Sequence, residues 1–199
     1  MHTGAATVLI VPGLRDHVPQ HWQTLLTARL PRGRSITPLG RDNLDCAARV
    51  EQIEHHAARV DGPVILVAHS GGVIPAVRWA RSTTRQVRGA LFATPPDFEK
   101  PLGEGYPSID ALRANGWLLQ SHERLRFPSI VAASRNDPLA SYARVAEMAR
   151  EWRSQLVDLG DVGHLNPASG YGEWPMAERL IAELEAEPAR CWIRQRLAR

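Results

Sequence analysis

Cysteine is scarce in this sequence: Cys46 and Cys191 are the two among its 199 residues. Two thiols so far apart have no need to pair, so the cysteine content favours a reducing compartment. Long hydrophobic runs are also missing, and none approaches the ~20 apolar residues that span a bilayer. The N-terminus carries no basic segment followed by a cleavage site. We therefore expect a cytoplasmic protein that has no membrane partner.

Lysine is almost absent, since Lys100 is the single lysine among 24 basic residues. The arginines are spread along the chain between acidic residues, so the net charge of +3 is not gathered into a basic block that would bind nucleic acid. Residues 190–199 are the one arginine-rich stretch, and we interpret them as a solvated helix end, where cations are favourable. No nucleic-acid partner is expected.

The histidines and acidic residues lack metal-ligand spacing of the H-E-x-x-H type, so neither a metal nor a cofactor is expected. What the sequence does contain is typical of a soluble globular protein, with 44% hydrophobic and 23% charged residues. Its length suits one well-packed domain and is short for two. We expect a single domain over residues 1–199, with a core at about 6–185 and a basic tail at 186–199.

Short apolar runs alternate with segments of helical periodicity along the whole chain. This alternation predicts an α/β fold with a parallel sheet of about six strands and helices on both faces, and ligands then bind at the carboxyl ends of the strands. Asp42 or Asn43 is the expected N-cap of the second helix. The expected strands are residues 7–11, 35–37, 64–68, 89–93, 129–133 and 155–159, and the expected helices are 19–30, about 43–60, 73–82, 110–115, 142–152 and 174–185.

Residues 64–72 carry the most informative pattern, Val-Ile-Leu-Val-Ala-His-Ser-Gly-Gly. An apolar strand runs directly into a turn at Ser70, and a helix follows. A serine at such a corner is a nucleophile elbow, usually written G-x-S-x-G, in which small residues two before and two after the serine let the turn close. Ala68 and Gly72 occupy those positions here. Taken alone, the same five-residue pattern also occurs in ordinary loops.

A serine nucleophile needs a base and an acid that orients the base, and in this fold they follow in the order serine, acid, histidine. The expected acid is Asp137, directly after the strand at 129–133. Asp97, after the preceding strand, is the alternative acid. Asp161 is interpreted as a loop residue, because it lies only three positions before the histidine proposed below.

The expected base is His164, which follows the last strand in a loop that Gly163 makes adaptable. His69 is adjacent to Ser70, and its side chain is expected to point away from the site. His17 and His21, together with Trp22, are expected to line a substrate pocket with residues 97–127. The remaining histidines are terminal, helical or in the irregular segment, namely His2, His55, His56 and His122.

A developing oxyanion needs two backbone N–H donors. The residue after the serine, Gly71, supplies one of them in this fold, and the loop after the first strand supplies the other. We expect the second donor to be the N–H of Leu14, because Gly13 lets the backbone come close.

Several motifs together resemble one family, the small α/β hydrolases that include retinoblastoma-binding protein nine and bacterial YdeN-like serine hydrolases. The resemblance implies a minimal α/β-hydrolase fold without a large lid domain, and serine hydrolase activity. It places nucleophile, acid and base on Ser70, Asp137 and His164. The motifs are Pro12-Gly13-Leu14 with His21-Trp22, Ala68-His69-Ser70-Gly71-Gly72, Asn136-Asp137-Pro138, Gly163-His164-Leu165-Asn166, and Ser169-Gly170-Tyr171-Gly172-Glu173-Trp174-Pro175.

Two departures limit the resemblance. Gly71 stands where many α/β hydrolases have a leucine or another side chain. The segment Leu44-Asp45-Cys46-Ala47-Ala48 lacks the acid of the mammalian Leu-x-Cys-x-Glu motif, so binding to a retinoblastoma-type pocket is not expected. We interpret the Ser169–Pro175 block as a structural brace for the His164 loop.

The sequence thus predicts a serine hydrolase that cleaves small or medium acyl esters through an acyl-enzyme. Its expected partner is a small-molecule ester, and nothing in the sequence indicates an oligomeric state. An amidase or a thioesterase would use the same residues. The alternative from another class is a catalytically weak hydrolase scaffold that acts as a binding or interaction protein.

Overall fold

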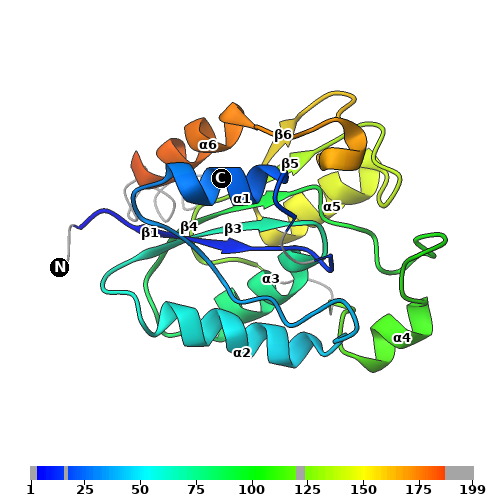
Figure 1. The fold of residues 1–199 in the computed structure, drawn as a ribbon, viewed down its shortest axis with the longest axis horizontal. Helices are drawn as coiled ribbons and strands as arrows, with labels where there is room; N and C mark the ends of the chain where they lie inside the picture. The colour runs from blue at the N-terminus through cyan, green and yellow to red at the C-terminus, as the bar shows by residue number, and fades with distance from the viewer. Residues whose placement is uncertain (1–3, 16–17, 120–123, 187–199) are drawn as a thin grey trace, which may run out of the picture.

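A single parallel sheet organises the computed structural model, which describes residues 4–15, 18–119 and 124–186 (Figure 1). Its six strands run in the order β2-β1-β3-β4-β5-β6, and every neighbouring pair is parallel. The strands are β1 (Thr7–Val11), β2 (Gly33–Ser35), β3 (Val64–His69), β4 (Val87–Ala93), β5 (Ser129–Ala133) and β6 (Gln155–Asp158). The predicted parallel sheet of about six strands is therefore confirmed.

Helices cover both faces of the sheet, as the strand–helix alternation predicts. Figure 1 shows α1 and α6 on one side of the sheet and α2 and α3 on the other. The α-helices are α1 (Trp22–Arg29), α2 (Cys46–Ala57), α3 (Val73–Ser82), α4 (Ile109–Ala114), α5 (Tyr142–Trp152) and α6 (Pro175–Ala186), and two 3-10 turns are η1 (Ser70–Gly72) and η2 (Pro167–Ser169).

The core is divided into two main layers by the alternation of side chains along each strand. Leu66 and Phe92 lie in the layer that packs against α2, α3 and α5. Val67 and Leu91, their neighbours in sequence, lie in the layer that packs against α1 and α6. All four side chains are fully buried. A continuous apolar run such as β3 is therefore stable only in the middle of a sheet that is covered on both faces.

Several boundaries expected from the sequence are wrong by two or three residues: α1 begins at Trp22 rather than 19 and β4 at Val87 rather than 89, and β2 and α2 also differ. The second strand is Gly33–Ser35 rather than 35–37, because the chain pairs with β1 as soon as it leaves α1, with Val8 opposite Gly33. Helix α2 begins at Cys46, and its N-cap is Asp45, whose carboxylate accepts from the N–H groups of Ala47 and Ala48. Asn43, one of the two expected caps, instead accepts from the N–H of Asp45.

The carboxyl ends of the strands all lie at one edge of the sheet, because every strand is parallel. The segments that leave this edge include the loop after β1, the turn after β3 and the loops after β5 and β6. Between β4 and β5 the described residues contain one short helix, α4, and no lid domain. Within the same described ranges, no helix combines the length and the apolar character needed to cross a membrane.

Two neighbouring leucines of α1 provide a test of this packing. Leu26 is 4% exposed and lies in the layer beneath α1, whereas Leu25 is half-buried and outside it. Leu26→Ala should lower the free energy of unfolding by about 2–5 kcal/mol, because it leaves a cavity in the core. Leu25→Ala is the matched control and should change stability by less than about 1 kcal/mol. Urea unfolding measures both, and equal losses would contradict the packing described here.

Candidate active site

Ser70 lies at a sharp corner between β3 and α3. Its backbone has a φ of 54°, in the left-handed region that non-glycine residues rarely adopt. Such strain persists only where the surrounding structure enforces it, and it clusters at functional sites. The turn directs the Ser70 side chain away from the sheet at the carboxyl end of β3, so the strand–turn–helix context expected of a nucleophile elbow is present.

The corner can close because Gly72 has no side chain. A Cβ atom at Gly72 would lie 2.3 Å from the carbonyl oxygen of Pro12 and 2.7 Å from that of Val11. Both neighbours are backbone atoms of the loop after β1, so neither can move aside cheaply. On the other side of the turn, a Cβ at Gly13 would lie 3.1 Å from the Cβ of Ser70. The two loops are therefore packed backbone against backbone.

Three side chains from different strand ends form a line at this edge of the sheet. His164 Nε2 lies 2.7 Å from Ser70 Oγ, and His164 Nδ1 lies 2.9 and 3.0 Å from the two carboxylate oxygens of Asp137. A carboxylate only accepts hydrogen bonds, so Nδ1 carries a proton, and in the neutral imidazole Nε2 accepts from the Ser70 hydroxyl. The side chains of His164 and Asp137 are 6% and 1% exposed.

A second set of hydrogen bonds joins the loop after β5 to the loop after β6. The Asn136 side-chain oxygen accepts from the Ser134 hydroxyl at 3.0 Å and from the N–H of Gly163 at 2.6 Å. The Ser134 oxygen accepts in turn from the N–H of Val162. Hydrogen bonds from the loop that contains Asp137 thus position the loop that contains His164, and they fix the distance between the carboxylate and the imidazole.

The loop after β6 is also held from its far side. The N–H of His164 donates to Ser169 Oγ at 3.0 Å, and the Ser169 hydroxyl donates to the side chain of Asn166. A side chain at Gly163 would collide with Ser169, since a Cβ there would lie 2.5 Å from Ser169 Oγ. Trp174 packs edge-on against Trp22, with ring centroids 4.8 Å apart. The bracing function predicted for the Ser169–Pro175 block fits these contacts.

The sequence interpretation expected His69 to point away from the site, and this is wrong, because His69 lines the pocket. Its imidazole is buried between those of His21 and His164, with ring centroids 4.6 and 5.0 Å away. His69 Nε2 donates to the backbone carbonyl of His164 at 2.9 Å, because a carbonyl can only accept. Burial, and then the neighbouring His164 and His21, lower the pKa of His69 well below its usual value. His69 is therefore neutral at pH 7.

Asp97, the alternative acid, lies elsewhere. Its carboxylate is 5% exposed and is 3.7 Å from Arg144 Nε and 3.8 Å from Lys100 Nζ. Its Oδ1 atom also accepts from the N–H of Glu99. Among the described residues, Asp137 is the carboxylate that bonds to the imidazole of His164.

A pocket of about 290 Å³ opens above Ser70. His21 lines it, but Trp22 does not: that indole is 1% exposed and packs below, against Trp174 and His69. The expectation for Trp22 is therefore wrong, because Trp22 lies on the face of α1 that packs into the core together with Leu26. His17 lies outside the described residues. The expected contribution of residues 97–127 comes from Phe98, Leu102 and Tyr106.

Leu14 and Gly71, the residues expected to supply oxyanion donors, lie next to each other. A Cβ at Gly71 would lie 2.9 Å from Leu14 Cγ, so the leucine side chain occupies the space that a larger residue at position 71 would need. This packing accounts for the glycine at position 71. The N–H of Gly71 also lies at the start of the η1 turn, where backbone donors point out of the helix.

The described residues, 4–15, 18–119 and 124–186, contain no group of three or more histidine, cysteine or acidic side chains arranged to hold a metal ion. Cys46 is buried beneath α4, and burial raises the pKa of its thiol to about 11. This thiol is therefore protonated and unreactive at neutral pH.

The fold and the serine–histidine contact are those of an α/β-hydrolase that uses a serine. Comparison with known proteins agrees, because the serine hydrolase family matches residues 8–183. The chain belongs to the serine hydrolase family. The comparison with curated proteins finds no match.

Solved structures give the same result. A putative YdeN-like hydrolase from Pectobacterium atrosepticum is 29% identical, with 91% of each chain covered and a TM-score of 0.77. The ydeN gene product of B. subtilis is 18% identical, with 92% of this chain and 100% of that chain covered and a TM-score of 0.74. The resemblance to YdeN-like hydrolases predicted from the motifs is confirmed. Est1E from Butyrivibrio proteoclasticus, solved with ferulic acid, shares the fold at 11% identity, with 94% of this chain and 92% of that chain covered and a TM-score of 0.69.

The elbow can be tested with a pair of glycines. Gly72→Ala should lower the free energy of unfolding by about 1–3 kcal/mol or more, because its Cβ meets fixed carbonyl oxygens. Gly172→Ala is the matched control, since its Cβ would have no neighbour closer than 3.7 Å, the carbonyl oxygen of Gln20. Urea unfolding compares the two, and a neutral Gly72→Ala would show that the elbow is not closely packed.

The lowered pKa of His69 predicts a pH dependence of stability. Below pH ~6.5 the unfolded chain takes up a proton on this imidazole that the folded protein excludes. Stability should therefore fall as the pH falls from 6.5, by up to about 1.4 kcal/mol per pH unit from this one group. His69→Gln keeps a donor for the His164 carbonyl and removes the titration. Its unfolding free energy should depend less steeply on pH between 6.5 and 5, and identical slopes would contradict a buried neutral His69.

Proposed function

We propose that the protein is a carboxylesterase that cleaves small or medium acyl esters through an acyl-enzyme at Ser70. The observation that carries this proposal is the 2.7 Å contact between Ser70 Oγ and His164 Nε2 on a serine whose backbone is held at a φ of 54°. A serine hydroxyl is a weak nucleophile unless a base takes its proton, and the contact supplies that base.

In the proposed first step, Ser70 Oγ attacks the ester carbonyl carbon and its proton passes to His164 Nε2. The carbonyl oxygen becomes an oxyanion, and the N–H groups of Leu14 and Gly71 stabilise it. The bond from the carbonyl carbon to the alcohol oxygen then breaks, and the proton on His164 passes to that oxygen. Asp137 orients the imidazole and stabilises its positive charge.

The second step repeats the first with water. His164 takes a proton from a water molecule that attacks the acyl-enzyme, and the proton then passes to Ser70 Oγ as the carboxylic acid leaves. The apolar side chains of Leu14, Phe98 and Leu102 around the pocket support a hydrocarbon acyl group. The pocket volume of about 290 Å³ supports a small or medium one. The free thiol of Cys46 supports a cytoplasmic location.

The first experiment combines labelling with kinetics. A fluorophosphonate should add once to the purified protein, as measured by intact mass, and the adduct should be absent from Ser70→Ala. With 4-nitrophenyl butyrate as the substrate, Ser70→Ala and His164→Ala should lower kcat by about 10⁴–10⁶-fold, and Asp137→Ala by about 10³–10⁴-fold.

Asp97→Asn is the matched control for the acid, because Asp97 is equally buried but faces Arg144. Asp97→Asn should leave kcat within about threefold of the wild type, whereas Asp137→Asn should lose about 10⁴-fold. An unlabelled, folded wild-type protein would overturn the proposal in favour of a binding protein. Labelling without ester turnover would redirect the search to amides and thioesters.

A further inference from the structure

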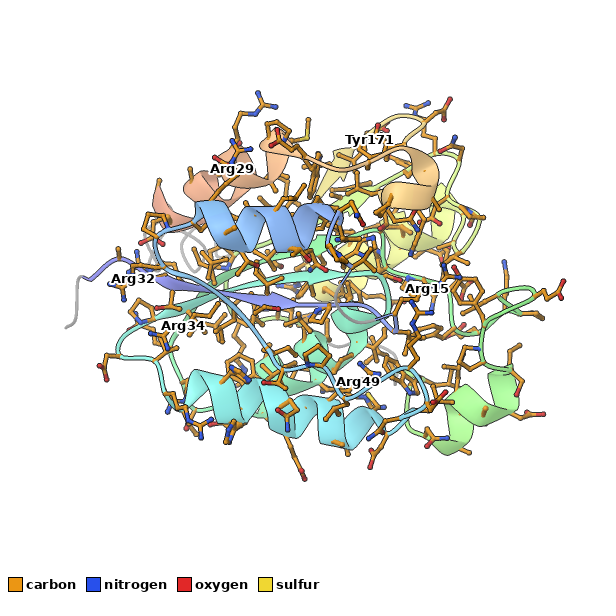
Figure 2. All side chains as sticks on the ribbon, viewed as in Figure 1. Arg15, Arg29, Arg32, Arg34, Arg49 and Tyr171 are labelled. Atoms are coloured by element: carbon orange, nitrogen blue, oxygen red, sulfur yellow. The ribbon has the colours of Figure 1, made fainter. Side chains whose placement is uncertain are left out.

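The wall of the pocket above Ser70 changes character with depth. The inner wall is made of buried side chains, among them His69, Pro96, Phe98 and Leu139. Arg15 and Arg41 also line the pocket, and both are exposed to solvent. The two arginines therefore lie at the solvent-exposed end of the pocket, and we call Arg15 and Arg41 its rim. Figure 2 shows Arg15 beyond the carboxyl ends of the central strands.

No ion pair among the described residues includes Arg15 or Arg41. No acidic residue occurs among the described residues that line the pocket. This differs from the arginines elsewhere on the surface, several of which pair with a glutamate or an aspartate. They include Arg29, Arg85, Arg88, Arg113, Arg135 and Arg144.

Contacts hold the Arg15 side chain and the backbone of the loop that carries Arg41. The Arg15 guanidinium carbon lies 5.2 Å from the centre of the Tyr106 ring. The backbone on either side of Arg41 is held by Arg49, which is 6% exposed and donates to the carbonyls of Gly40 and Asn43 at 3.2 and 3.0 Å. A buried arginine thus anchors the backbone of the loop that carries the exposed Arg41.

We propose that the natural substrate is an ester that carries a carboxylate, and that Arg15 and Arg41 bind this carboxylate while the ester group lies at Ser70. This inference rests on the proposed hydrolase function and specifies its substrate class. A guanidinium group matches a carboxylate in shape and charge, and it stays charged at any physiological pH. The apolar wall then contacts the hydrocarbon between the two groups, and water reaches the charged end.

Two matched pairs of substrates test the proposal. The first is 4-nitrophenyl hydrogen adipate against its methyl ester, which places the carboxylate on the acyl side. The second is 4-acetoxybenzoate against methyl 4-acetoxybenzoate, which places it on the alcohol side. The measured quantity is the ratio of kcat/KM for the acid to kcat/KM for the methyl ester, after subtraction of the uncatalysed rate. We expect a ratio of about 10 or more in at least one pair, since each charge-assisted contact at a partly solvated site contributes a few-fold.

Variants of Arg15 and Arg41 test whether these two residues cause the preference for the acid over the methyl ester. Arg15→Gln and Arg41→Gln should each lower the ratio about threefold, mainly through KM, and the double variant should bring it close to 1. Arg41→Lys keeps the charge and should retain part of the preference. Arg150→Gln is the control, because Arg150 is 75% exposed on α5 and does not line the pocket. The wild-type ratio should also fall as salt rises to 0.5 M, where the screening length is only about 4 Å.

The outcomes separate the two proposals. If both methyl esters are hydrolysed and neither acid is preferred, or if the double variant keeps the preference, the rim inference is overturned and the esterase stands. If no ester is hydrolysed and a fluorophosphonate does not label Ser70, the proposed function itself fails. Melting temperatures within about 2 °C of the wild type would show that the exposed arginine variants remain folded.

Discussion

The close approach of two backbone segments at the end of β3 is the constraint on which the rest of the site depends. Ser70 can hold its left-handed conformation only while the turn behind it is pressed against the carbonyls of Val11 and Pro12, and this contact leaves room for no side chain at Gly72. The strain at Ser70 is offset by the packing of β1 and β3 in the centre of the sheet. The elbow is therefore stable because the sheet is stable, rather than because its own residues favour the turn.

A second level of organisation comes from the neighbouring strand ends. The loops after β5 and β6 are joined through Asn136 and Ser134, and the loop after β6 is held again by Ser169. Three of these hydrogen bonds join a side chain to a backbone N–H group and one joins two side chains, and together they position the loops without a secondary-structure ladder. Because of them the imidazole lies at hydrogen-bond distance from both Ser70 and Asp137. This is the preorganised arrangement that the proposed mechanism requires.

Charge and burial vary together along the pocket: the buried end near Ser70 carries no unpaired charge, and the exposed end carries two arginines. Near Ser70 the groups are uncharged or paired: His69 is neutral, and the Asp137 carboxylate bonds to His164 and to the N–H of Leu139. The free positive charge lies at the solvent end, on Arg15 and Arg41. A charged group close to the serine would be costly to desolvate, whereas an arginine at the rim keeps its hydration and can still attract an anion.

Much of this protein could be predicted from the sequence, for identifiable reasons. The apolar run of β3 and the small residues around Ser70 are local signals, and so is the order of Ser70, Asp137 and His164 after β3, β5 and β6. Hydrophobic periodicity located the helices for the same reason. The bounds of elements were predicted less accurately, because specific hydrogen bonds set them. Strand β2 begins where it can pair with β1, and helix α2 begins where the Asp45 side chain caps its first N–H groups.

Only the tertiary structure decided which side chains meet. His69 donates to the His164 carbonyl, and Asn136 accepts from the N–H of Gly163. The partners in each pair are far apart in the sequence, and no sequence pattern predicts that they meet. Trp22 faces the core rather than the pocket, because it lies on the face of α1 that packs into the core together with Leu26. The local sequence determines where each strand ends and which reactive side chains follow it, because both depend on residues that are close together in the chain. Which groups face one another is set by the packing of the whole sheet and its helices.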